Sequence, residues 1–185
     1  MAVDPPAWVC AELIEWARGV VVAARAGGSA PRSLRLLEAD SLHLTLCFLG
    51  SRPVAEIEAL SDVLSACTEP ACALSLGAPL WLPPRRAHAL AVEVHDREGE
   101  LARLQAWLVE SLESVSGWRS ERRRFRPHIT LVRGRGRGPL RERALAATPR
   151  LQFVPEAIVL YRSWLGPDGA SYEALASSAL LGAAR

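Results

Sequence analysis

The pattern His-x-Thr-Leu occurs twice in the chain, as His-Leu-Thr-Leu at 43–46 and as His-Ile-Thr-Leu at 128–131. The two copies are 85 residues apart, which is close to half of the 185 residues. Each copy begins a short apolar run of a strand's length, and side chains alternate between the two faces of a strand. Each strand would therefore place its His and Thr on one face and its apolar residues on the other. The simplest architecture with such a repeat is two similar lobes that face each other.

Hydrophobic periodicity places helices and strands around the two copies. Apolar residues recur with helical spacing at 7–25, 53–67 and 101–115, with Asp4 and Asp96 as the expected N-caps of the first and third helices. Strands are expected at 42–49, 74–82 (an irregular edge strand), 88–94, 127–132, 157–165 and 171–176, with a short helix at 140–147. The mixed order indicates an α+β fold. We expect residues 1–185 to form a single domain of two pseudo-symmetric antiparallel-sheet lobes, with outer helices around a central groove.

The composition excludes several classes of protein. No apolar stretch of 18 residues is free of charge, so no membrane-spanning helix is expected, and the first nine residues lack the basic region of a secretory signal. The four cysteines, Cys10, Cys47, Cys67 and Cys72, form no C-x-x-C pair, which indicates buried reduced thiols and disfavours a structural zinc site. We expect a cytoplasmic monomer that has no metal, no cofactor and no membrane partner.

Charge is distributed unevenly along the chain. The formal net charge is +2, but residues 1–84 carry five Arg and nine acidic residues, whereas residues 85–185 carry 17 Arg and 11 acidic residues. Ten Arg lie between Arg119 and Arg143, against two acidic residues. A polyanion or a phosphate ester is a natural partner for such a segment. A solvated basic loop is an equally good explanation of the charge alone.

The faces that carry His and Thr suit phosphodiester chemistry. In a strand, the Cα atoms of His43 and Thr45 would be about 6.6 Å apart at roughly 3.3 Å per residue, which leaves room for a phosphate. Threonine hydroxyls can donate hydrogen bonds to phosphate oxygens. One neutral imidazole can take a proton from water while one protonated imidazole gives a proton to the leaving alkoxide. This general base and general acid would need no metal. A single His of this kind would more often have a structural role. Two matched copies, each with its Thr, favour a catalytic role instead.

The two motifs carry a resemblance to a known family. Residues 43–50 (His-Leu-Thr-Leu-Cys-Phe-Leu-Gly) and 126–133 (Arg-Pro-His-Ile-Thr-Leu-Val-Arg) are similar to the paired motifs of the 2H phosphoesterase superfamily, and more closely of its LigT/ThpR branch, the RNA 2′,3′-cyclic phosphodiesterases once called 2′-5′ RNA ligases. Residues 160–173 resemble the closing hairpin of that branch, and residues 2–6 resemble the end of its first strand. The resemblance implies a bilobal fold that opens a 2′,3′-cyclic phosphate to a 2′-phosphate without metal or ATP.

The resemblance also implies roles for individual residues. His128 would be the base that activates water and His43 the acid for the 3′ oxygen, although a pseudo-symmetric site permits the reverse. Thr45 and Thr130 would bind the phosphate. Arg133, just after the second motif, matches a basic position of the branch and would be a further phosphate ligand. In a regular strand Arg133 would face away from His128, so this role requires a bulge or a strand end.

Other functions are left open by the sequence. A small cyclic nucleotide or an ADP-ribose cyclic phosphate could replace RNA as the substrate, the reaction could run backwards as 2′-5′ ligation, or the chain could be a non-catalytic module that binds RNA ends. Three aromatic residues could stack on a base. Phe48 is expected in the core because it shares the core face of its strand, whereas Trp81 and Trp118 are undecided. His88 and His95 are expected to be structural or at the surface.

Overall fold

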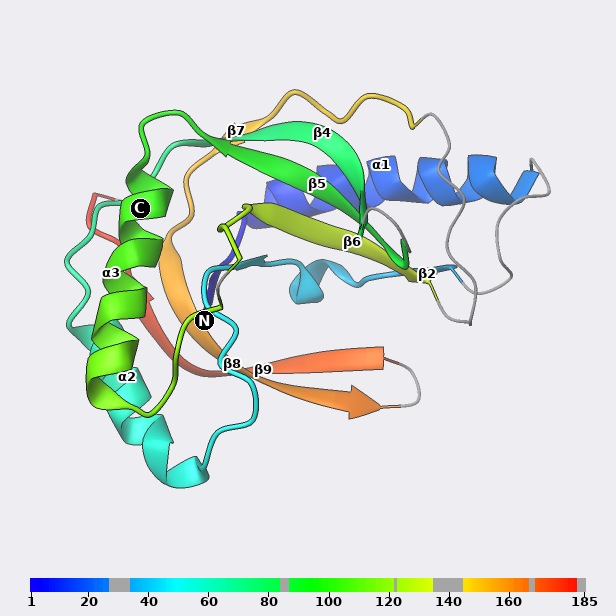
Figure 1. The fold of residues 1–185 in the computed structure, drawn as a ribbon. Helices are drawn as coiled ribbons and strands as arrows, with labels where there is room; N and C mark the ends of the chain where they lie inside the picture. The colour runs from blue at the N-terminus through cyan, green and yellow to red at the C-terminus, as the bar shows by residue number, and fades with distance from the viewer. Residues whose placement is uncertain (27–33, 84–86, 122, 135–144, 167–168, 183–185) are drawn as a thin grey trace.

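The computed structural model describes residues 1–26, 34–83, 87–121, 123–134, 145–166 and 169–182. These residues form one nine-stranded sheet in which every strand pair is antiparallel. The sheet order is β7-β4-β5-β6-β3-β1-β8-β9, and β2 pairs with β6 beside this path. Figure 1 shows the two arms of the sheet, one ending in β4 and β5 and the other in the β8–β9 hairpin. The arms meet where β3 pairs with β6.

The strands of the first arm are β7 (Gln152–Phe153), β4 (Leu74–Leu82), β5 (Ala89–Asp96) and β6 (His128–Gly134). The second arm holds β3 (Leu44–Thr45), β1 (Ala2–Val3), β8 (Ala157–Gly166) and β9 (Gly169–Ala179). Strand β2 (Leu34–Leu36) lies beyond β3 along the same edge of β6. The short strand β3 is therefore the joint between the arms.

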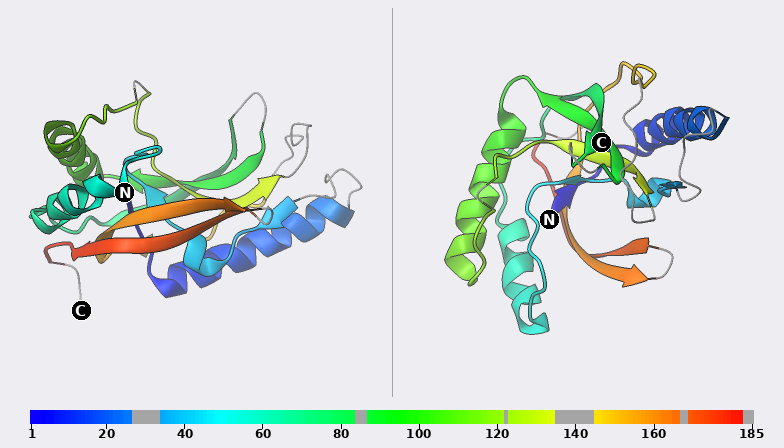
Figure 2. Two further views of the ribbon diagram at one scale, coloured as in Figure 1. Left: turned by 90° about the horizontal axis from the view of Figure 1, so that it is seen from below. Right: turned by 45° about the vertical axis from the view of Figure 1, so that its right-hand side comes forward.

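Three helices cover the sheet. Helices α2 (Ile57–Ser65) and α3 (Glu100–Val115) lie side by side at one end of the molecule, while α1 (Ala7–Ala26) runs behind β6 toward the other end (Figures 1 and 2). Two short 3₁₀ turns, at Ala39–Ser41 and Val54–Glu56, precede β3 and α2. One face of α3 is fully buried and consists of Leu101, Leu104, Leu108 and Leu112. The expected α+β fold, with an antiparallel sheet and outer helices, is confirmed.

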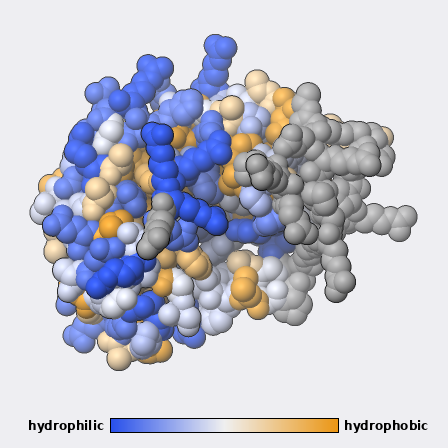
Figure 3. All heavy atoms as spheres, in the orientation of Figure 1, coloured by the Kyte–Doolittle hydropathy of each residue, from blue (hydrophilic) through white to orange (hydrophobic). Residues whose placement is uncertain are grey.

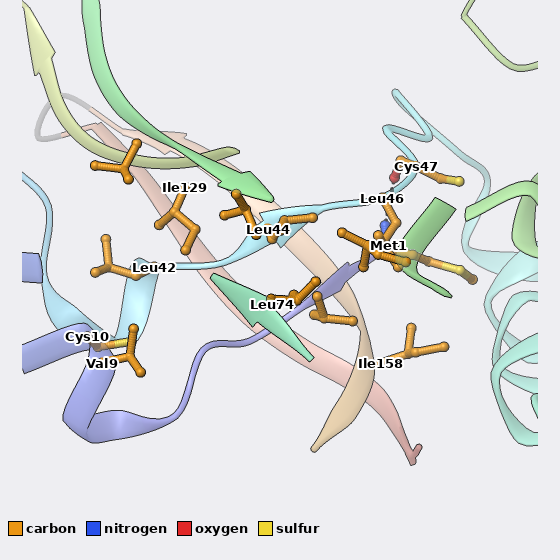
Figure 4. Close-up of a cluster of buried hydrophobic side chains, with 14 of the residues drawn as sticks. Met1, Val9, Cys10, Leu42, Leu44, Leu46, Cys47, Leu74, Ile129 and Ile158 are labelled. Carbon is orange, nitrogen blue, oxygen red and sulfur yellow. Dashed lines mark hydrogen bonds between the residues drawn. The ribbon is translucent and has the colours of Figure 1, made fainter. Parts of the chain in front are cut away.

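One hydrophobic core runs beneath β3 and β6. Leu42, Leu44 and Leu46 are all buried, and Leu44 packs in the same cluster as Ile129 (Figure 4). The alternation of apolar residues expected for both motifs is therefore present. Cys10, Cys47, Cys67 and Cys72 are free and buried, as predicted. No helix in the described part of the chain is long and apolar enough to cross a membrane.

Several predicted element boundaries are wrong. The strand expected at 42–49 is paired at Leu44–Thr45 alone. Beyond Thr45 the amides of Leu46 and Cys47 both donate to the carbonyl of Met1, which departs from a regular ladder. Strands β2 and β7 had no clear sequence signal. Strand β4 pairs with β7 at Leu74 and Ser75 only. Pro79 lies further along β4, where this side of the strand is an edge of the sheet, as expected. The helix expected at 140–147 falls largely outside the described residues.

The two expected N-caps have different outcomes. The carboxylate of Asp4 accepts a hydrogen bond from the Tyr161 hydroxyl at 2.6 Å, and the amides of Val9 and Cys10 in α1 donate to the carbonyl of Pro6, so the prediction for Asp4 is wrong. Asp96 belongs to β5, but its Oδ2 accepts a hydrogen bond from the Ala102 amide at 3.0 Å. Asp96 therefore stabilises the first turn of α3 from outside the helix.

Candidate active site

The pairing of β3 with β6 brings the two motifs together. Leu44 lies opposite Ile129 in an antiparallel register. Continuing this register by one residue on each side places His43 opposite Thr130 and Thr45 opposite His128. Because directly opposed residues project to the same face, all four polar side chains lie on the face away from Leu44 and Ile129, which are 1% and 0% exposed. The two motifs therefore form one cluster with local two-fold symmetry.

A bulge in β6 adds Arg133 to this face. On β5, Ala91 pairs with Thr130 and the next residue, Leu90, pairs with Val132, so Leu131 is an extra residue in β6. Leu131 and Val132 are consecutive and both are fully buried. The extra residue reverses the alternation, so that Arg133 shares a face with His128 and Thr130. The bulge that a phosphate-binding role for Arg133 requires is present.

Both imidazoles are held by the same backbone contact. The Nδ1 atom of His43 lies 3.0 Å from the carbonyl oxygen of Ser41, and the Nδ1 atom of His128 lies 2.7 Å from the carbonyl oxygen of Arg126. A carbonyl oxygen can only accept, so Nδ1 must carry the proton in each ring. Each Nε2 is left to accept a proton from a ligand when the ring is neutral, or to donate one when the ring is charged.

The environment of His43 disfavours its charged form. Burial is the main cause, and the positive charges of the Met1 amine, Arg133 and His128 act in the same direction. The hydrogen bond to Ser41 opposes them but is outweighed, and the pKa of His43 falls to about 4. His43 is therefore neutral at pH 7. The electrostatic effect of Arg133 and His128 on His43 agrees with their positions on one face.

Two tyrosines of the β8–β9 hairpin pack beside the ring of His43. The ring of Tyr172 lies edge-on to His43 with centroids 4.6 Å apart, and the ring of Tyr161 lies 5.6 Å away. The hydroxyl of Tyr161 donates to Asp4, and burial raises its pKa. These contacts hold the ring of His43 in addition to its bond with Ser41. The resemblance at 160–173 included both tyrosines, but no signal in the sequence placed Asp4 here.

The three candidate stacking residues differ in their exposure to solvent. Phe48 is 67% exposed, so the prediction that it lies in the core is wrong: β3 ends at Thr45, and the loop that follows turns the ring outward. The indole of Trp118 is buried and donates to the carbonyl oxygen of Phe48 at 3.0 Å. Trp81 packs against the core. Phe48 is the aromatic side chain, among the three, that is available to a ligand.

Basic residues flank the His128 side of the cluster. In the connector between α3 and β6, Arg119, Arg123, Arg124 and Arg126 are exposed. Arg126 forms an ion pair with Glu93, which lies opposite His128 on β5. Hydrophilic side chains cover much of the face that is turned to the viewer in Figure 3. The connector that leads into β6 therefore carries exposed positive charge that a polyanion could meet.

The cluster as a whole has the groups that phosphodiester chemistry requires. Two imidazoles with free Nε2 atoms, two hydroxyls and an arginine can bind a phosphate and transfer protons to and from it. His95 is exposed and packs against Gly77 of β4, at the surface as predicted. The described residues contain no group of three or more His, Cys, Asp or Glu side chains that could hold a metal ion.

Comparison with protein families identifies one match that spans most of the chain. The family model described as the 2′-5′ RNA ligase superfamily matches residues 12–165. The RNA 2′,3′-cyclic phosphodiesterase of Escherichia coli K12 is 33% identical over 133 residues, which are 71% of this chain and 69% of the relative. The protein of the same description from Thermus thermophilus is 30% identical over 182 residues, 92% of this chain and 87% of the relative.

Solved structures agree with these relationships. A crystal structure of a Thermus thermophilus protein superimposes with a TM-score of 0.78 at 27% identity and covers 98% of this chain and 96% of that chain. Escherichia coli LigT in complex with 3′-AMP gives a TM-score of 0.74 at 28% identity, with 97% and 95% coverage. The likeness thus includes both arms of the sheet and the joint that carries the two His-x-Thr motifs.

Proposed function

The chain belongs to the 2′-5′ RNA ligase superfamily, and from this premise we propose that it is an RNA 2′,3′-cyclic phosphodiesterase. Two curated relatives described above carry this activity in their names, at 33% and 30% identity. The observation that carries the proposal is the matched geometry of His43 and His128. Each ring is held through Nδ1 by the carbonyl two residues earlier, and each leaves Nε2 for the substrate.

We propose a single-step hydrolysis. A cyclic phosphate lies between the two imidazoles, with its non-bridging oxygens accepting hydrogen bonds from Thr45, Thr130 and Arg133. One histidine removes a proton from water as the water oxygen attacks phosphorus. The bond from phosphorus to the 3′ oxygen breaks, and the other histidine gives that oxygen a proton. The product is a 2′-phosphate. Charge that develops on the phosphoryl oxygens is stabilised by the two hydroxyls and the guanidinium.

The charge of the unliganded site favours one order of roles. Because the pKa of His43 is lowered to about 4, its Nε2 is unprotonated at neutral pH and can accept the proton of water. This makes His43 the base and His128 the acid, which is the reverse of the order implied by the resemblance. The negative charge of a bound phosphate acts against this preference, because it raises the pKa of a neighbouring imidazole. The pH dependence of a variant that keeps only one of the two histidines distinguishes the two orders.

We propose an RNA end, rather than a small cyclic phosphate alone, as the substrate. Phe48, whose ring is exposed, follows Thr45 by three residues. The backbone carbonyl of Phe48 accepts a hydrogen bond from the Trp118 indole. Single-stranded RNA is commonly bound by stacking its bases on such aromatic rings. The exposed arginines before β6 supply positive charge beside the cluster. Ligation at 2′-5′ junctions would be the same step in reverse.

We further propose that residues 1–185 act as one domain of two lobes, because strands from both halves of the chain join in a single sheet. The catalytic cluster depends on both halves, since β3 supplies one motif and β6 the other. We expect the protein to act as a monomer in the cytoplasm, without a metal or a cofactor. A module that only binds RNA ends would not need two matched Nε2 atoms that can transfer protons, so we favour catalysis over this alternative.

Replacing either histidine by alanine should abolish most of the activity. We expect His43→Ala and His128→Ala each to lower kcat by about 10²- to 10⁴-fold on an RNA that ends in a 2′,3′-cyclic phosphate, because each variant lacks one proton carrier. The exposed His95 provides a matched control, and His95→Ala should retain wild-type turnover. Near wild-type turnover in either motif variant would exclude the two-histidine mechanism. Binding of the RNA without turnover by the wild-type protein would indicate the non-catalytic module instead.

The pH dependence of kcat/KM should reveal the role of His43. In the wild type both orders give the same bell-shaped profile, because one histidine must be protonated and the other unprotonated. The variant His128→Ala keeps His43 alone, so its residual kcat/KM reports the role of His43. With His43 as the base, this residual activity stays level from neutrality down to about pH 4 and decreases below it, whereas with His43 as the acid it decreases as the pH rises through about 4. Initial rates of His128→Ala from acidic to alkaline pH, with circular dichroism to confirm folding at each pH, separate the two cases. A loss of this residual activity as the pH rises through about 4 contradicts our assignment.

Removing the ring of Phe48 should weaken the binding of RNA more than it slows the reaction. Stacking contributes about 1–3 kcal/mol per base, so Phe48→Ala should raise KM for an RNA end by roughly 5- to 150-fold with little change in kcat. Phe48→Tyr keeps the ring and should behave as the wild type does. If KM is unchanged in Phe48→Ala, the exposed ring does not contact a base.

A further inference from the structure

A second arginine lies directly beside Arg133. In the β2–β6 pair, Arg35 is the Cα partner of Arg133. Its neighbours Leu34 and Leu36 pack against the core, which places Arg35 on the opposite face. Because paired residues project to the same side, Arg35 shares the face of Arg133, Thr130 and His128. The sequence did not single out Arg35, because it lies in the acidic half of the chain and outside both motifs.

The two guanidinium groups have no carboxylate partner among the described residues. The ion pairs among the described residues involve other arginines, namely Arg18, Arg52, Arg103 and Arg126. Like charges that lie directly opposite in a sheet destabilise it. Anions bound beside Arg35 and Arg133 would offset this repulsion, and guanidinium groups bind phosphate oxygens in a bidentate manner. This part of the face is therefore suited to more than one phosphate group.

The side chain of Arg35 extends to the tip of the β8–β9 hairpin. Its guanidinium packs against Gly169, where a Cβ atom would overlap Nη1. Gly169 adopts a φ of +111°, which favours glycine for a second reason. Tyr172, which contacts His43, follows Gly169 by three residues, or about 10 Å along β9 at roughly 3.4 Å per residue. The guanidinium of Arg35 thus lies at the hairpin tip, and β9 connects this tip to the residue that contacts His43.

This position fits a second phosphate of the substrate. A cyclic phosphate carries one negative charge, for which Arg133 and the two threonines suffice. An RNA end has another phosphate, the 5′-phosphodiester of the terminal nucleotide, on the far side of the ribose. We propose that Arg35 binds this 5′-phosphodiester and makes the site select RNA ends over mononucleoside cyclic phosphates. This inference rests on the proposed function and names the group by which the substrate class is recognised.

Two substrates that differ in this phosphate test the proposal. We would measure kcat and KM for cytidine 2′,3′-cyclic phosphate and for the dinucleotide adenylyl-(3′→5′)-cytidine 2′,3′-cyclic phosphate. Arg35→Gln should raise KM for the dinucleotide by about 10- to 100-fold, the range of a lost charge-assisted hydrogen bond, and leave KM for the mononucleotide within about twofold. Arg18→Gln, which changes an exposed arginine on α1, is the matched control and should change neither value.

A neutral internal linkage provides the complementary test. The same dinucleotide with a methylphosphonate linkage keeps both nucleosides but lacks the negative charge, so the wild type should bind it about as weakly as Arg35→Gln binds the natural dinucleotide. Arg35→Met, which keeps much of the aliphatic side chain but lacks the charge, should show the same selective loss and covers the case in which Arg35→Gln folds poorly. An equal loss on both substrates, or none on either, would overturn the proposal. Failure of the wild type to open either substrate would instead refute the proposed function.

Discussion

The antiparallel pairing of β3 with β6 is the constraint on which the site depends. Leu44 and Ile129 are buried opposite each other, and burying two such side chains contributes about 1.5–3 kcal/mol each. Because side chains alternate along a strand, this buried pair forces His43, Thr45, His128 and Thr130 onto the other face. A shift of the register by one residue would send the polar groups into the core. The same hydrophobic contact thus stabilises the joint between the arms and assembles the polar cluster.

The repeat His-x-Thr-Leu allowed the site to be predicted, because strand alternation is local and both copies carry it. The helices and the closing hairpin followed from periodicity in the same way. Features that depend on contacts between distant segments could not be predicted. Phe48 is exposed where regular pairing has ended at Thr45 and the amides of Leu46 and Cys47 both donate to the carbonyl of Met1. The bulge at Leu131 is defined only by pairing with β5. Asp4 precedes the first helix as an N-cap residue would, but its hydrogen bond with Tyr161 joins segments that are 157 residues apart.

The site combines local symmetry with asymmetric surroundings. Both imidazoles have the same hydrogen bond through Nδ1, yet the hairpin tyrosines pack against the ring of His43. The hydrogen bond of His128 lies in an exposed environment, whereas burial lowers the pKa of His43. A pair of groups whose environments differ in this way can divide the roles of base and acid. We propose that the arginines on the same face select the anions that bind.

The central claim, that the two histidines open a cyclic phosphate by expelling the 3′ oxygen, is tested most directly by the structure of the product. A short RNA that ends in a 2′,3′-cyclic phosphate would be incubated with the purified protein in EDTA, and the phosphorus followed by ³¹P NMR. The account predicts that the cyclic phosphate resonance is replaced by that of a 2′-monophosphate. A 3′-phosphate product, or a cyclic phosphate that stays intact in the presence of folded protein, would contradict it.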